Sequence, residues 1–113
     1  MDKLTTYREL IKRLLAKCVE LDNQHPAPGV EHLLITDDEQ GHYIWLNVGW
    51  WQRERLNAMT AYVRLKDGKF RIEEDMTEFG IANELLEASV PKEDIVLAFQ
   101  HPQERQHTEF AAA

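Results

Sequence analysis

The feature that most limits how this chain can fold is a ten-residue apolar run, His42–Trp51 (HYIWLNVGWW). The run is almost free of charge and rich in aromatic and β-branched residues, which favour a β-strand. Because side chains alternate along a strand, one face carries Ile44, Leu46, Val48 and Trp50, and the other carries Tyr43, Trp45, Asn47, Gly49 and Trp51. Both faces are substantially apolar and need cover. We expect helices on one face and, on the other, further protein from this chain or from a partner.

The segment before this run predicts a helix followed by a loop. Apolar residues recur at spacings of three and four from Asp2 to Leu21, which is typical of an amphipathic helix. Asp2 is the preferred N-cap, with a Thr6–Glu9 capping box as a later alternative. We expect Asp22–Gly29 to be irregular, since it contains two prolines and a glycine.

The middle of the chain predicts two antiparallel hairpins. Val30–Thr36 and His42–Trp51 are joined by a short polar turn, and Gln52–Arg55 is a polar break. Leu56–Lys66 is the third predicted strand, with Met59, Ala61, Val63 and Leu65 on one face. Asp67-Gly68 is a strong hairpin signal, and a two-residue loop there pairs Leu65 with Phe70, Val63 with Ile72, Arg64 with Arg71 and Lys66 with Lys69.

The last third predicts a helix and a buried strand. Thr77 is the expected N-cap of a helix that reaches Ala88, with Phe79, Ala82, Leu85 and Leu86 facing inward. Ile95–Phe99 is a short, wholly apolar run of the kind found in buried strands. The chain of 113 residues is therefore expected to form a single α+β domain spanning residues 1–113, in the order α-β-β-β-β-α-β, with an antiparallel meander sheet packed by two helices.

The charge and cysteine content limit the classes of function. The formal net charge is −7, and an acidic domain is poorly suited to binding nucleic acid through its phosphates. A basic protein partner is a better match. The single Cys18 cannot form an internal disulfide, and the sequence has neither a signal-peptide pattern nor an apolar run long enough to span a bilayer. We expect a cytoplasmic protein with no membrane partner.

The sequence shows no constellation typical of catalysis. The five histidines form no metal-binding pattern, and Cys18 lies on the apolar stripe of the first helix. Asp37–Glu39 and Glu73–Asp75 are acidic clusters, which we interpret as a turn and a helix entrance and not as a magnesium site. We therefore predict no catalytic residue, no metal and no cofactor. A metal-dependent hydrolase is the third-ranked alternative, and an EDTA-sensitive activity would support it.

Two groups of residues are candidates for binding. The first combines the aromatic strand with two nearby cations and is a candidate partner interface: Tyr43, Trp45, Trp50, Trp51, Arg53 and Arg55. Trp, Tyr and Arg are enriched where protein partners dock. The second is a candidate anion-facing patch on the Asp-Gly hairpin: Arg64, Lys66, Lys69 and Arg71. Long side chains that splay into water and protect a sheet edge also explain this patch, and we prefer that explanation.

Taken together, these landmarks resemble the XisI family, the fdxN element excision controlling factor proteins known chiefly from cyanobacteria. The resemblance begins at MDKLTTYRELIKRLL and covers essentially the whole chain, through PAPGVE, NVGW and the closing TEFAAA. Its most distinctive parts are Asp67–Lys69, Asp75–Ala82, Val90–Leu97 and Thr108–Ala111.

The resemblance implies an accessory role in the excision of a DNA element. Members of the family are associated with a site-specific recombinase and with a nuclease-like companion of the XisH type. We therefore expect a non-enzymatic control factor that binds a XisH-like protein, with a homodimer or higher homo-oligomer as a further expectation. A direct DNA-binding excisionase that uses the basic hairpin is the second-ranked alternative, although direct nucleic-acid binding conflicts with the acidic net charge.

Overall fold

Five strands form one mixed sheet in the computed structural model, which describes residues 2–25 and 27–113. The strands follow chain order across the sheet: β1 (Val30–Asp37), β2 (His42–Trp51), β3 (Glu54–Lys66), β4 (Lys69–Asp75) and β5 (Ile95–Leu97). β1 to β4 are antiparallel neighbours, whereas β5 lies parallel to β4. The predicted α+β class and four-strand meander are confirmed. The parallel fifth strand follows from the segment between β4 and β5, which returns the chain to the starting end of β4.

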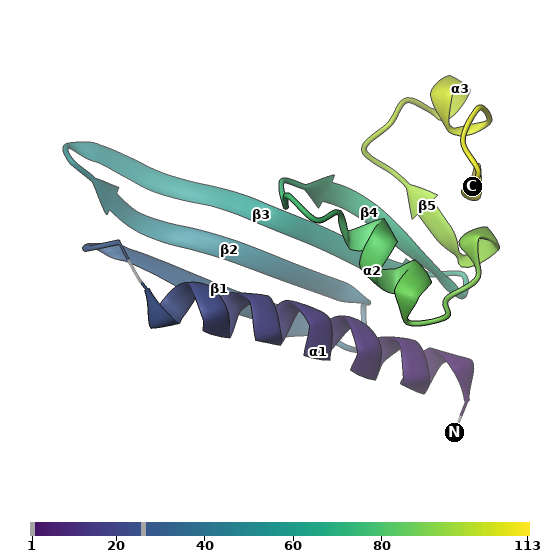
Figure 1. Ribbon diagram of the computed structural model, residues 1–113, viewed down its shortest axis with the longest axis horizontal. Helices are drawn as coiled ribbons and strands as arrows, with labels where there is room; N and C mark the ends of the chain where they lie inside the picture. The colour runs from purple at the N-terminus through teal and green to yellow at the C-terminus, as the bar shows by residue number, and fades with distance from the viewer. Residues whose placement is uncertain (1, 26) are drawn as a thin grey trace.

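The two longer helices lie on one side of this sheet (Figure 1). They are α1 (Lys3–Gln24) and α2 (Ile81–Glu87), with a 3-10 turn η1 (Lys92–Asp94) before β5 and a short α3 (Pro102–Arg105) near the C-terminus. α1 contacts β1 and β2, and α2 contacts β4. Within the residues that the structure describes, the helices lack an apolar stretch of the length that a bilayer crossing requires.

α1 begins where the sequence predicts and ends later. The Asp2 carboxylate accepts a hydrogen bond from the Thr5 N–H at 2.7 Å, which confirms Asp2 as the N-cap. The helix continues to Gln24, so the first part of the predicted loop Asp22–Gly29 is helical. A proline disfavours helical backbone in the residue before it, in agreement with a helix that ends at Gln24 with His25 as its C-cap. Pro26, part of the same prediction, lies outside the described residues.

The core lies between α1, α2 and the helix-covered face of the sheet. It contains the buried stripe of α1, two side chains of α2 and apolar side chains from β2 to β5: Tyr7, Ile11, Leu15, Val19, Tyr43, Trp45, Ala61, Val63, Leu65, Phe70, Ile72, Ile81, Leu85 and Ile95. The predicted register of the Asp-Gly hairpin is confirmed, with Leu65 opposite Phe70 and Val63 opposite Ile72.

A β-bulge in β3 changes which face Met59 occupies. Trp45 pairs with Ala61 and Leu46 pairs with Met59, so Thr60 is an extra residue in β3. Met59 therefore shares the face of Leu46 and is exposed, whereas simple alternation predicts that it shares the face of Ala61. The polar break also shortens to the two residues Gln52 and Arg53, because β3 begins at Glu54.

α2 begins four residues after the predicted cap. Thr77 is tied into a turn in which its Oγ1 accepts from the Gly80 N–H at 3.1 Å. Gly80 has φ +81°, a left-handed conformation that suits glycine and delays the helix. The Asp75 carboxylate instead accepts from the Ile81 N–H at 2.8 Å. Phe79, predicted to face inward from the helix, precedes it and is exposed.

Both outer edges of the sheet carry backbone-directed contacts. On the β1 edge, the Asn23 side chain donates to the His32 carbonyl at 3.0 Å and accepts from the His32 N–H at 3.4 Å. On the β5 edge, the C-terminal tail folds back, and the Ala111 N–H donates to the Ile95 carbonyl at 2.9 Å. The C-terminal tail therefore adds an isolated parallel bridge, Val96–Ala111, at this edge of the sheet.

Candidate functional site

The face of the sheet opposite α1 and α2 carries a continuous set of apolar side chains. We call it the open face, and define it by the cross-strand rows Leu33–Leu46–Met59 and Ile35–Ile44–Tyr62, followed by Val48 and Trp50. Leu33 is 38% exposed, and Ile35 and Met59 are each 43% exposed. Within residues 2–25 and 27–113, no helix packs over these rows (Figure 1). The face expected to need additional protein is thus the one that contains Ile44 and Leu46.

The tip of the β2–β3 hairpin carries two exposed tryptophans, of which Trp50 belongs to the open face. Trp50 and Trp51 are 55% and 56% exposed, and they point to opposite sides of the hairpin. The Arg55 guanidinium carbon lies 5.4 Å from the centre of the Trp50 ring, a cation–π distance, and its Nη1 donates to the Gly49 carbonyl at 3.2 Å. This geometry holds an aromatic ring and a cation together at the surface.

The predicted interface set is divided by the structure. Tyr43 is fully buried and Trp45 is 6% exposed, both on the helix-covered face, so these two residues are core and not surface. Alternation could have separated them from Trp50, but the sequence does not reveal which face the helices cover. Trp50, Trp51, Arg53 and Arg55 stay together at the hairpin tip as an interface prediction.

Glu73 modifies the predicted anion-facing patch. Arg64 pairs with Arg71 and Lys66 with Lys69, as the Asp-Gly register requires. The Glu73 Oε2 lies 3.7 Å from Arg64 Nη1 and 3.6 Å from Arg71 Nε, between the two guanidinium groups. Lys69 Nζ is hydrogen bonded to the Ala113 carbonyl. We expected Glu73 at a helix entrance, but it lies in β4, where its position two residues after Arg71 places both side chains on one face.

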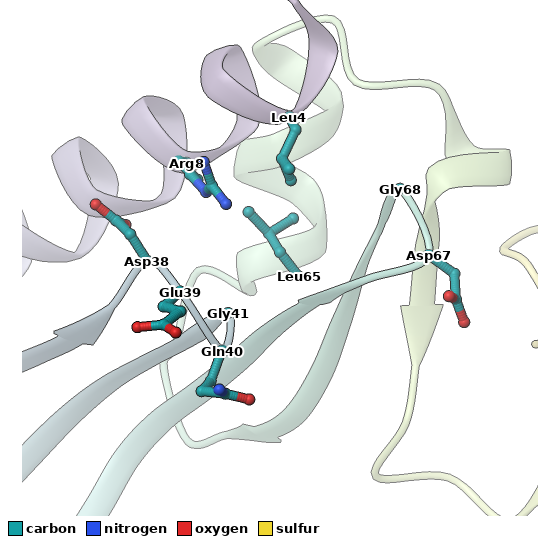
Figure 2. Close-up of a pocket in the computed structure, with 9 residues that line it drawn as sticks. All are labelled: Leu4, Arg8, Asp38, Glu39, Gln40, Gly41, Leu65, Asp67 and Gly68. Atoms are coloured by element: carbon teal, nitrogen blue, oxygen red, sulfur yellow. The ribbon is translucent and has the colours of Figure 1, made fainter.

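A small cavity of about 180 Å³ lies between α1 and two turns of the sheet. Figure 2 shows Leu4, Arg8 and Leu65 converging on it, whereas Gln40 and Asp67 point away. Asp38 lies beside Arg8, but its carboxylate accepts from Lys12 Nζ and from the Tyr43 hydroxyl, both at 2.8 Å. The Lys12 hydrogen bond lowers the pKa of Asp38, so this carboxylate stays ionised at neutral pH.

The charged groups beside this cavity form a structural ion pair between Lys12 and Asp38. Burial, with the hydrogen bond to Asp38 as a second cause, raises the pKa of Tyr43 to about 12, so the phenol stays protonated and donates. Neither the Asp38 carboxylate nor the Tyr43 phenol exchanges its proton near pH 7, as a general acid or base would. Among its lining residues, the cavity lacks a nucleophile with an adjacent base.

The single cysteine is also placed for packing. Cys18 lines a shallow groove of about 160 Å³ between α1 and α2, together with Leu14, Leu21 and Phe79. Burial raises the pKa of the Cys18 thiol, and the Glu84 carboxylate contributes in the same direction. A raised pKa reduces the thiolate fraction and therefore the nucleophilicity. Among the described residues, no three His, Cys, Asp or Glu side chains are grouped so that they could hold a metal ion.

Known proteins and one family model match this chain over nearly its whole length. The family model described as "XisI protein" matches residues 1–112. The crystal structure of a XisI-like protein from Anabaena variabilis ATCC 29413 is 39% identical, with a TM-score of 0.92 over 97% of this chain and 99% of that chain. The fdxN element excision controlling factor XisI from the same organism is 40% identical, with a TM-score of 0.87 over 99% of this chain and 100% of that chain. No curated protein matches the chain.

Proposed function

The chain belongs to the XisI family, and from that premise we propose that it is a non-enzymatic control factor for excision of a DNA element, acting by binding a XisH-like partner protein. A solved relative that is 40% identical over nearly the whole chain is named an fdxN element excision controlling factor, which supports the excision setting. The proposed binding mode rests on the surface of the sheet.

The open face is the observation that carries this proposal. Monomeric proteins rarely expose contiguous apolar patches beyond about 300–600 Å², and larger ones mark interaction sites. Here two adjacent rows of Leu, Ile, Met and Tyr side chains lie side by side on three strands, and Trp50 continues them toward the hairpin tip. Burial of such side chains by a partner stabilises a complex by about 25 cal/mol per Å² before the costs of association are subtracted.

The hairpin tip supplies the residue types that dominate protein interfaces. Trp50, stacked with Arg55, and the exposed Trp51 resemble the aromatic and arginine anchors found at interface centres. The tip adds directional contacts to the otherwise apolar open face. An acidic or polar rim on the partner would suit Arg53 and Arg55.

Direct DNA binding is the less favoured candidate. Arg64 and Arg71 could contact phosphate, but Glu73 lies between them and a net charge of −7 opposes approach to DNA. If DNA binding is nevertheless the function, titration of duplex DNA should give a salt-dependent complex that the double substitution Arg64→Ala, Arg71→Ala abolishes.

A matched pair of substitutions on β1 tests the proposed function. Ile35 and Thr36 are adjacent exposed residues that point to opposite faces of the sheet. Co-purification with a XisH-like protein should be lost in Ile35→Lys, because a buried lysine would face the partner, and retained in Thr36→Lys. Equal binding by both variants would contradict the open-face proposal. An EDTA-sensitive hydrolysis by the purified chain alone would instead support the hydrolase alternative.

A further inference from the structure

The outer edge of β3 is unpaired along half its length. β4 pairs only with Ala61–Lys66, and the Met76 N–H then donates to the Thr60 carbonyl at 2.8 Å. From Glu54 to Met59, no other described residue pairs with the backbone on this side. Figure 1 shows the β2–β3 hairpin projecting beyond the end of β4. The sheet is therefore wider along Ala61–Lys66, where β4 pairs with β3, than along Glu54–Met59, where the edge of β3 is unpaired. We call this change in width the step.

The turn geometry shows which backbone groups are available at this edge. Gln52 and Arg53 form a two-residue turn, so the flanking pair Trp51–Glu54 is hydrogen bonded. Alternation along the ladder then directs the backbone groups of Leu56 and Ala58 toward β2 as well. The N–H and C=O groups that face outward belong to Arg55, Asn57 and Met59. Unpaired groups of this kind are a template for another strand.

We propose that a second copy of this chain adds to this edge, with the two β3 strands antiparallel about a two-fold axis at Leu56. The register follows from the step itself. The Gln52–Arg53 turn of one copy must stop before Met76 of the other, which occupies the edge at Thr60. A two-fold at Leu56 satisfies this limit, and it pairs Arg55 of each copy with Asn57 of the other through outward-facing backbone groups.

Side-chain chemistry favours a second copy over an unrelated strand. In this register, the half-buried Leu56 faces its own symmetry mate, and no like charges stand directly opposite each other. The turn of one copy, which carries Arg53, approaches the end of β4 of the other, where Glu74 and Asp75 lie. The step is thus complementary to itself in hydrogen bonding, in apolar contact and in charge. This proposal concerns the sheet edge and does not depend on what binds the open face.

Two substitutions of one exposed residue test the proposal with opposite expected signs. In Asn57→Arg, a cation in each copy faces Arg55 of the other copy, and the dimer dissociation constant should rise about tenfold. In Asn57→Glu, a carboxylate faces Arg55 instead, and the dimer should tighten severalfold. General repulsion between copies of charge −7 predicts the reverse order, since Asn57→Arg reduces the magnitude of the net charge and Asn57→Glu increases it. Sedimentation velocity of the full chain over a range of concentrations measures both.

A cysteine substitution gives an independent measure of the register. Directly opposed residues in a non-hydrogen-bonded pair have Cα atoms about 4.5 Å apart, within disulfide range. In a Cys18→Ser background, Leu56→Cys should form a disulfide-linked dimer under mild oxidation. Ala58→Cys should not, because Ala58 faces Glu54 of the other copy. A monomeric wild-type chain, equal effects of the two Asn57 variants, or cross-linking in the Ala58→Cys variant but not in Leu56→Cys would overturn the proposal.

Discussion

The two faces of the sheet are built from similar residues but differ in how far their side chains are exposed. The helix-covered face presents Tyr43, Val63 and Ile72 to α1 and α2, and these side chains are buried. The open face presents Leu33, Ile35 and Met59, and these are exposed. Apolar composition alone therefore does not separate a core from a binding surface in this protein. The placement of the covering helices does, because α1 and α2 lie on the same side and, among the described residues, no helix covers the β1 to β3 rows on the other side.

The largest expected effect compares one truncation on each face. Phe70→Ala removes a fully buried ring from the helix-covered face and should reduce the free energy of unfolding by about 3–5 kcal/mol. Leu33→Ala on the open face should change it by only about 0.5 kcal/mol, because the side chain is already exposed. Urea unfolding of both variants measures the difference. Comparable losses would mean that the open face is covered in the free protein.

A smaller effect concerns the carboxylate that ties α1 to η1. The Asp94 Oδ2 accepts from the Tyr7 hydroxyl at 2.6 Å and lies 2.9 Å from Lys3 Nζ. Burial alone would raise the pKa of Asp94, but the hydrogen bonds from Tyr7 and Lys3 together lower this pKa below the ordinary value of an aspartate. The unfolded chain therefore takes up this proton first on acidification, and the stability contributed by the ionised carboxylate is lost as the pH falls from about 4 through the folded pKa.

Asp94→Asn tests this contact on the helix-covered face. The substitution keeps the shape and removes the charge, so it should cost about 1.5–3 kcal/mol at pH 7. The difference in unfolding free energy between the two proteins should shrink as the pH is lowered toward about 3. Urea unfolding at a series of pH values measures it, and a difference that stays constant with pH would show that ionisation of Asp94 does not stabilise the fold.

The smallest expected effect concerns the ion-pair cluster of Arg64, Arg71 and Glu73. Glu73 contacts Arg64 and Arg71 at 3.7 and 3.6 Å between partly exposed side chains, so Glu73→Gln should cost less than about 1 kcal/mol. The loss should diminish at high salt, because added ions screen exposed pairs. Unfolding in low and high salt measures it. A larger, salt-independent loss would place this cluster in the same class as the buried contacts of the other face.

Local sequence chemistry predicted the elements and one register well. The Asp67-Gly68 turn determined the pairing of Arg64 with Arg71, and Asp2 marked the start of α1, because both signals act over a few residues. The same reasoning placed Phe79 and Met59 wrongly. The left-handed Gly80 delays α2, and the extra Thr60 in β3 reverses the alternation before it.

The candidate surface was only partly accessible from sequence. Alternation correctly separates Trp45 from Trp50, but the choice of covered face depends on how α1 crosses β1 and β2, which is a long-range property of the chain. The position of Glu73 between two arginines depends likewise on the pairing of β3 with β4. The sequence could thus name the aromatic and apolar residues that need cover, and it could not say which of them the fold buries in its own core.

The Asn23 side chain has a consequence for assembly. Its amide engages both backbone groups of His32 in the manner of a neighbouring peptide, and the C-terminal tail engages the opposite border through Ala111. Contacts of this kind at both outer borders obstruct the addition of further strands there. If two copies join at their inner steps, each uses up the free strand edge of the other, and the union terminates at a pair instead of propagating as a fibril.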